Sequence, residues 1–159
     1  MSDLPVTQAI RVLRAAKVPF EGHLYKYVEK GGTAQSAKEL GVEEHIVVKT
    51  IIVEDENRKP MVVLMHGDRE ISLKNLARFI GAKTLHPCNP NTANKHTGYM
   101  VGGTSPFGTK KQMPVYAEES IFELDKILIN GGKRGFLVII DPKDMERVLK
   151  PVKVNVGIE

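Results

Sequence analysis

IVVKTIIVEDENRKPMVVLM, residues 46–65, carries the strongest structural signal in this chain. Two runs rich in β-branched and other apolar residues, 46–53 and 60–65, flank the polar segment EDENRK. Apolar runs of this length on either side of a short polar loop are typical of two antiparallel strands. We therefore expect a buried β-hairpin over residues 46–65.

Before this hairpin, the spacing of apolar residues and the glycines predict two helices and a strand. A stripe of apolar residues at helical spacing, followed by an aromatic and β-branched run and then by Gly31-Gly32, supports this order. The predicted elements are a helix with its stripe from Val6 to Ala16 and Ser2 or Asp3 as the cap, a strand over 20–28, and a helix from Thr33 to a cap at Gly41.

After the hairpin, caps and a turn signal predict further elements. They are a helix capped by Ser72 and closed by Gly81, a strand around Val115 and Tyr116, a hairpin over 127–140 with Asn130-Gly131 in its turn, a helix capped by Asp141, and a last strand at 152–156. Residues 86–114 contain four prolines and four glycines, and we expect an irregular loop there. A loop this long inside a compact domain is usually functional.

These elements predict one α/β domain of the mixed α+β kind spanning residues 1–159. Because the strands come mainly in hairpins, we expect a mixed, largely antiparallel sheet, not a doubly wound parallel one. The chain has 159 residues, 42% of them hydrophobic, and a net charge of +4, which favours a polyanionic partner. Its single cysteine cannot form an internal disulfide, and no apolar stretch has the length of a signal or a membrane span. We expect a cytoplasmic protein with no membrane partner.

The sequence offers little conventional catalytic chemistry. The five histidines lack the spacing of a metal site, so we expect no metal. His86 and Cys88 lie two residues apart and would share a face of a strand, but a small apolar cysteine near a loop is the favoured interpretation over a thiol with its base. No Gly-x-Ser-x-Gly motif supports a serine nucleophile.

Lysines and glycines are the more informative candidates. Lys49 interrupts an apolar row of a predicted strand, so its stem either reaches a surface or its ammonium enters a cleft to meet an anionic or polar ligand. Residues 102–108, GGTSPFG, form either a turn or a nest of amide donors, and Lys110 and Lys111 follow directly. The segment GGKRG, 131–135, is either a solvated turn or a basic hairpin tip that binds a ligand.

Four segments together resemble the YbaK/EbsC family, also called the prolyl-tRNA editing domain. They are VVKT (47–50), KNLARFIGAK (74–83), TGYMVGGTSPFGTKK (97–111) and NGGKRG (130–135), in this order. The resemblance covers the chain essentially end to end. It implies a mixed sheet of about seven strands curled into a partly open barrel, with helices packed around it.

The resemblance also implies an activity and a site. Such proteins are deacylases that remove cysteine from mischarged tRNA(Pro), and also act on Cys-tRNA(Cys), with prolyl-tRNA synthetase as a partner and no cofactor. The thiol of the substrate is its own nucleophile, so a protein nucleophile is not expected. The resemblance maps the essential lysine to Lys49, the glycine-rich loop to Gly102, Gly103, Ser105, Pro106 and Gly108, and an aromatic residue at the pocket mouth to Tyr25. On this basis we expect Lys49, Gly102 and Gly103 to be catalytic, and we expect Lys110, Lys111, Lys133 and Arg134 to bind tRNA. The residues expected to bind the substrate are Tyr25, Thr50, Ser105, Pro106, Phe107, Gly108, Asn130 and Gly131.

Some relatives have serine in place of Asn130 and a polar residue where this chain has Phe136-Leu137, so a hydroxyl role at position 130 is not expected. Two rival functions stay open: a deacylase for Ala-tRNA(Pro) that uses water, and a non-catalytic module that binds tRNA or a synthetase. A nucleotide hydrolase is disfavoured because the chain lacks a metal-binding acidic cluster.

Overall fold

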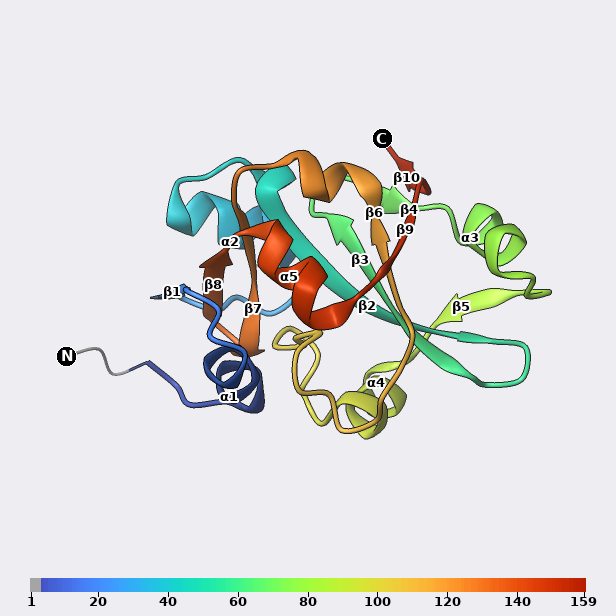
Figure 1. Ribbon diagram of the computed structural model, residues 1–159, viewed down its shortest axis with the longest axis horizontal. Coiled ribbons are helices and arrows are strands. Elements are labelled where there is room, and N and C mark those ends of the chain that lie inside the picture. The colour runs from blue at the N-terminus through green and yellow to red at the C-terminus, as the bar shows by residue number, and fades with distance from the viewer. Residues whose placement is uncertain (1–3) are drawn as a thin grey trace.

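The computed structural model describes residues 4–159, which form helices around a central sheet (Figure 1). The helices are α1 (Gln8–Ala15), α2 (Gly32–Leu40), α3 (Leu73–Ile80), α4 (Pro90–Thr97) and α5 (Pro142–Leu149), with short 3-10 turns η1 (Glu44–Ile46) and η2 (Glu119–Glu123). The strands are β1 (Glu21–Leu24), β2 (Val47–Asp55), β3 (Pro60–His66), β4 (Glu70–Ile71), β5 (Leu85–Pro87), β6 (Val115–Glu118), β7 (Ile127–Lys133), β8 (Phe136–Ile140), β9 (Val152–Val154) and β10 (Gly157–Ile158).

The main sheet is mixed, as predicted. Its order is β1-β8-β7-β2-β3-β6-β9, and β5 pairs with the far end of β2. The contacts of β2 with β7, β3 with β6, and β6 with β9 are parallel, whereas the hairpins and the β2–β5 contact are antiparallel. Within the described residues the sheet path stays open, since β1 and β9 are not paired with each other.

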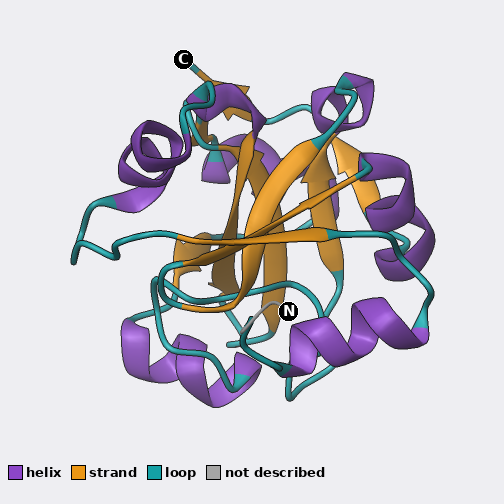
Figure 2. Ribbon diagram, turned by 90° about the vertical axis from the view of Figure 1, so that its left-hand side faces the viewer, coloured by secondary structure: helices purple, strands orange, loops and turns teal. Residues whose placement is uncertain are grey.

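The predicted hairpin over 46–65 forms β2 and β3 and is buried on both faces. Val48 and Ile52 point into the largest apolar cluster, whereas Val53 joins a second cluster beneath α3. Figure 2 shows helices around the periphery of the central strands. Both faces of this hairpin are therefore removed from water, and this explains why its sequence is nearly continuous in apolar residues instead of alternating.

Helix caps follow the sequence signals at most positions. Ser72 and Asp141 accept hydrogen bonds from backbone N–H groups at the starts of α3 and α5, and Gly41 and Gly81 adopt the left-handed conformation at the ends of α2 and α3. The predicted start of the first helix was wrong. Helix α1 begins later, and the hydroxyl of Thr7 caps it by accepting from the N–H of Ile10 at 3.1 Å. Ser2 and Asp3 lie outside the described residues.

Three other expectations need correction. The predicted strand over 20–28 is only the four-residue β1, because the chain leaves the edge of β8 after Leu24. Residues 86–114 are not wholly irregular, since they contain the end of β5 and all of α4. Asn89 as cap and Pro90 in the first turn were the local signals for this polar helix. In the second hairpin Asn130 lies within β7 at a bulge, and the chain reverses at Arg134-Gly135.

None of the helices described over residues 4–159 is long and apolar enough to cross a membrane. That residues 1–159 make up a single domain stays a prediction.

His66, at the end of β3, is a buried histidine with both ring nitrogens in hydrogen bonds. Nδ1 lies 2.8 Å from the carbonyl oxygen of His45, and Nε2 lies 2.7 Å from Oγ of Ser120. The ring of His45 stacks on it at 3.8 Å between centroids. Burial lowers the pKa of His66 below its usual value. The hydrogen bond to the backbone of His45 opposes this, the charge of the His45 ring adds to it, and the carboxylates of Asp68 and Glu118 oppose it.

We expect this histidine to make the protein less stable in mild acid. In the unfolded chain a histidine takes up its proton near pH 6.5, whereas folded His66 takes it up only at lower pH. The unfolded state therefore binds more protons below about pH 6.5, and the free energy of unfolding decreases as the pH falls from that value towards the folded pKa. Urea denaturation between pH 7 and 5 should show this decrease, with a smaller slope in His66→Gln. His23→Gln, at a partly exposed histidine, is the control, and equal slopes for wild type and His66→Gln would contradict the assignment.

Candidate functional site

A split in the sheet along one edge of β2 lies beside a large cleft. On this edge β7 pairs only with Val47 and Val48, and β5 pairs only with Val53–Asp55. Residues 49–52 therefore have no strand neighbour on this side in the part of the chain that the structure describes. On the other edge β3 pairs with β2 along nearly its whole length. The split leaves a stretch of strand whose backbone can bind a ligand.

The cleft at this split has a volume of about 790 Å³. This is within the range of pockets that hold small molecules and cofactors. Its wall consists of the free stretch of β2, the segment after β1, the start of α2, the segment from β5 into α4, the glycine loop at 101–104 and the tip of the β7–β8 hairpin. The segment after β1 continues into α2, so five separate stretches of the sequence meet around one space.

Lys49 lines this cleft from the free stretch of β2. It is partly exposed, and none of the ion pairs found among residues 4–159 includes it. Of the two alternatives for this lysine, the structure places the side chain at a cleft. An ammonium group without a carboxylate partner in a concave site can bind an anion or a ring of polar oxygens.

Thr50 adds unpaired polar groups to the same stretch. Its hydroxyl oxygen is buried and has no hydrogen-bond partner within the described residues, although the residue lines the cleft. The carbonyl of Val47 accepts from Gly67 on the β3 side at 2.7 Å, and the carbonyl of Ile52 accepts from Cys88 on the other side at 2.9 Å. Because backbone groups alternate along a strand, the N–H and C=O of Thr50 face the same side as those of Ile52, toward the cleft.

The glycine loop that follows α4 is held by the residues of its own motif. Tyr99 is buried, and its hydroxyl donates to the carbonyl of Phe107, while Asn94 donates to the carbonyl of Tyr99 at 2.9 Å. Burial raises the pKa of Tyr99 to about 12, so this hydroxyl keeps its proton. The N–H of Phe107 donates to Oγ of Ser105 at 3.1 Å. Much of the TGYMVGGTSPFG motif therefore fixes the shape of the loop.

The two adjacent glycines of this loop have different surroundings. Gly102 lines the cleft with a φ of 92°, a conformation that favours glycine. Gly103 is buried against the tip of the β7–β8 hairpin, and its N–H donates to the carbonyl of Met100 at 2.8 Å. The amide of Gly103 is thus already bonded inside the turn. Of the two predicted catalytic glycines, Gly102 is therefore the better placed to bind a ligand in the cleft.

The hairpin tip holds the glycine loop from the other side. Asn130 donates to the carbonyl of Gly102 at 3.1 Å, and Nε of Arg134 donates to the carbonyl of Val101 at 2.8 Å. The guanidinium carbon of Arg134 also lies 5.1 Å from the centre of the Tyr27 ring. Asn130 and Arg134 both line the cleft, and both are also structural clamps on the loop.

The predicted site residues therefore divide into two groups. The lining of the cleft contains Tyr25, Lys49, Thr50, Gly102, Asn130 and Arg134. The other predicted residues lie outside this lining: Gly103, Ser105, Pro106 and Phe107 are buried, Gly131 packs on the ring of Phe136, Gly108 packs on the backbone of Gln8, and Lys110, Lys111 and Lys133 are exposed.

Sequence reasoning missed Tyr27 and Cys88 as parts of the cleft. Tyr27 lies two residues after Tyr25, and this spacing was the available signal, because residues two apart in an extended segment share a side. Cys88 lines the cleft next to Glu54. Burial, together with Glu54, raises the pKa of its thiol to about 11, which agrees with the interpretation that Cys88 and His86 are not a reactive thiol with its base.

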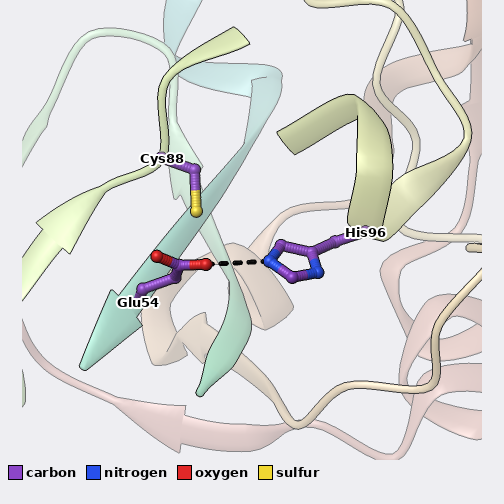
Figure 3. Close-up of side chains that lie close together, drawn as sticks. All are labelled: Glu54, Cys88 and His96. Carbon is purple, nitrogen blue, oxygen red and sulfur yellow. Dashed lines mark hydrogen bonds and ion pairs between the residues drawn. The ribbon is translucent and has the colours of Figure 1, made fainter. Parts of the chain in front are cut away.

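Next to Cys88 lie two side chains of types that bind metal ions, a carboxylate and an imidazole. Donor atoms of Glu54, Cys88 and His96 lie within 4.8 Å of one another (Figure 3). These residues belong to β2, the segment after β5, and α4, so no local spacing in the sequence could reveal the cluster.

Comparison with known proteins finds a family match over most of the chain. Residues 29–148 match the family model described as "Aminoacyl-tRNA editing domain". The chain is 33% identical over 138 residues to the Enterococcus faecalis protein named "Putative Cys-tRNA(Pro)/Cys-tRNA(Cys) deacylase EbsC", covering 86% of this chain and 84% of that protein. A "Proline--tRNA ligase" of Brachyspira hyodysenteriae is 30% identical over 86 residues, which are 54% of this chain and 15% of the ligase.

The fold is also known. The crystal structure titled "a putative trans-editing enzyme for prolyl tRNA synthetase" superposes with a TM-score of 0.82 at 19% identity, covering 98% of this chain and 100% of that one.

Gly103 is expected to tolerate no side chain. A Cβ atom there would lie 2.7 Å from the backbone nitrogen of Arg134 and 2.8 Å from the carbonyl carbon of Lys133, so Gly103→Ala must push the loop off the hairpin tip. We expect a loss of about 1–3 kcal/mol in the free energy of unfolding and faster amide exchange in residues 98–104. Thr104→Ala, the next residue, should change stability by less than about 0.5 kcal/mol. Equal stability of the two variants would show that the loop is not seated on the tip.

Proposed function

Because the chain belongs to the aminoacyl-tRNA editing domain family, we propose that it is a deacylase that removes cysteine from mischarged tRNA(Pro) and also acts on Cys-tRNA(Cys). The observation that carries the proposal is the free stretch of β2, where Lys49 and Thr50 present an unpaired cation and unpaired polar groups to one cleft. The name of the Enterococcus faecalis relative, which aligns over most of both chains, supports the choice of substrate.

The cleft supplies the contacts that an aminoacyl ester on a terminal adenosine needs. In the proposed complex Lys49 binds phosphate or ribose oxygens of that nucleotide and so positions the ester carbonyl. The edge of β2 at Thr50 offers hydrogen bonds to the polar groups of the aminoacyl-adenosine. The amide of Gly102 stabilises the negative charge that develops on the carbonyl oxygen, and Asn130 keeps this loop in place through the carbonyl of the same residue.

In the proposed reaction the substrate provides its own nucleophile. The sulfur of the cysteinyl group attacks the ester carbonyl, a C–S bond forms, and the bond between the carbonyl carbon and the ribose oxygen breaks. The thiol proton ends on the ribose hydroxyl, so the products are a cyclic cysteine thiolactone and deacylated tRNA. This route needs no nucleophile from the protein, and it is compatible with a cleft whose one cysteine, Cys88, has a raised thiol pKa.

The acceptor stem would approach over the basic residues near the glycine loop and the hairpin tip. Lys110, Lys111 and Lys133 are exposed there, and each contact with a phosphate would make binding more dependent on salt. Arg134 is already engaged with Val101 and Tyr27, so its contribution to tRNA binding would be inseparable from its role in holding the loop. The match to part of a proline–tRNA ligase supports prolyl-tRNA synthetase as the partner that supplies tRNA(Pro).

Lys49→Ala tests the proposal directly. We expect kcat/KM for Cys-tRNA(Pro) to fall by on the order of 100-fold or more, because the variant loses the cation that positions the ester. Deacylation of Cys-tRNA(Pro), Cys-tRNA(Cys) and Ala-tRNA(Pro) is measured with and without prolyl-tRNA synthetase. Lys59→Ala, an exposed lysine in the β2–β3 loop, is the matched control and should behave as wild type.

The outcomes separate the rival functions. Release of alanine in preference to cysteine would replace the proposal with a water-dependent Ala-tRNA(Pro) deacylase. Tight binding of all three tRNAs with no loss of the aminoacyl group would leave a non-catalytic binding module.

Thr50→Val tests whether the unpaired hydroxyl is kept for a ligand. Removing a buried hydroxyl that has no partner should leave the stability unchanged or raise it by up to about 1 kcal/mol, whereas deacylation should fall by about tenfold if the hydroxyl meets the substrate. Thr33→Val is a control for stability only, because Thr33 also lines the cleft: its hydroxyl donates to Glu44 at 2.7 Å, and its loss should destabilise the protein by about 1 kcal/mol. Full activity in Thr50→Val would remove Thr50 from the substrate contacts.

A further inference from the structure

The side of the cleft formed by β2, β5 and α4 contains a cluster of metal-ligating side chains that the proposed reaction does not use. Oε2 of Glu54 lies 2.8 Å from Nε2 of His96, and the thiol of Cys88 completes a set in which all donor atoms lie within 4.8 Å of one another. Figure 3 shows the three side chains converging from separate segments on one point. The side chains of Glu54 and His96 are only 11% and 13% exposed.

A fourth donor is within reach. His86 lies directly opposite Glu54 in the β2–β5 register, and its Nε2 is 3.9 Å from Oε1 of Glu54. Cys88 follows His86 by two residues, so both point from the same face of this ribbon. The side chain of His86 is 55% exposed, which leaves the imidazole ring free to turn toward the other three donors.

An ion pair explains only part of this arrangement. Glu54 and His96 satisfy each other, but the thiol of Cys88 beside the same carboxylate gains little from it, because a neutral thiol is a weak hydrogen-bond donor. A sulfur, two imidazole nitrogens and a carboxylate oxygen are the donors that zinc takes in proteins. Zinc bonds of about 2.0–2.3 Å in a tetrahedron separate the donors by about 3.3–3.8 Å. Donors already within 4.8 Å reach this by small side-chain rotations.

We propose that Glu54, Cys88, His96 and His86 bind one divalent transition-metal ion of the zinc type. Binding replaces the proton of the Cys88 thiol by a sulfur–metal bond, and this proton passes to the buffer. The ion would join β2, β5 and α4, and α4 continues through Gly98 directly into the glycine loop. The metal is thus a clamp that ties this loop to the floor of the cleft, and it also removes the one cysteine thiol of the cleft from reaction with small electrophiles.

Titration of the metal-free full-length protein with Co²⁺ and then Zn²⁺ tests the site without reference to deacylation. We expect one equivalent of Co²⁺ to produce the visible bands of a tetrahedral ion together with a thiolate-to-cobalt charge-transfer band, and Zn²⁺ to displace it. Cys88→Ser should lose the charge-transfer band, and Cys88→Ser and His96→Gln should each weaken Zn²⁺ affinity by on the order of 100-fold. His23→Gln removes a histidine of another histidine–glutamate pair, His23 with Glu21, and should bind as wild type.

Three results would overturn the proposal. The first is wild-type protein that binds no more Zn²⁺ than Cys88→Ser does. The second is a Co²⁺ spectrum without a thiolate band. The third is an equal loss of affinity in His23→Gln, which would indicate non-specific binding. Wild-type affinity in His86→Gln would overturn the assignment of the fourth ligand. Circular dichroism of each metal-free variant verifies that it is folded, and Zn²⁺ should raise the Tm of wild type but not of Cys88→Ser.

Discussion

Hydrogen bonding along the two edges of β2 determines both the shape of the sheet and the position of the cleft. One edge is satisfied along nearly its whole length by β3. The other edge is shared between β7 at the start of β2 and β5 at its end, and the carbonyl of Ile52 accepts from the N–H of Cys88 just after β5. Residues 49–51 between these partners have no strand neighbour on this edge within the described residues. Buried backbone groups are normally paired, so an uncovered stretch inside the fold is a place where a ligand can complete the hydrogen bonding.

The rest of the structure shapes the space beside this stretch. Helix α2, the segment after β1 and the segment from β5 into α4 all contribute to its wall. The glycine loop and the β7–β8 hairpin tip also line it and are bonded to each other through Asn130 and Arg134. The loop can approach the hairpin backbone so closely because Gly103 has no side chain. The cation, the open strand edge and the loop amide at Gly102 are therefore held in one arrangement by packing that lies mostly outside the cleft.

This arrangement changes how the most specific motif of the chain is understood. The motif TGYMVGGTSPFG carries much of the resemblance to the editing family. In the structure, however, its residues Tyr99, Ser105 and Phe107 are buried and fix the shape of the loop. A motif can thus mark a site through residues that never touch a ligand. The predicted roles of Ser105, Pro106 and Phe107 in substrate binding have no support from their positions, whereas Tyr27 lies in the cleft without belonging to any motif.

The sequence by itself determined the elements that depend on neighbours along the chain. The buried hairpin at 46–65, the caps at Ser72 and Asp141 and the glycine ends at Gly41 and Gly81 follow from periodicity and from backbone sterics, which act over a few residues. The polar helix α4 was not predicted, because its cap signal lies among prolines and because the helix has only a narrow apolar face.

Only the tertiary structure decided where β2 lacks a partner, which of the two glycines faces the cleft, and that Glu54, Cys88 and His96 meet. Each of these features requires segments that are 30 or more residues apart in the sequence to lie side by side. Strand pairing and core packing set that placement, and local spacing in the sequence does not reveal it.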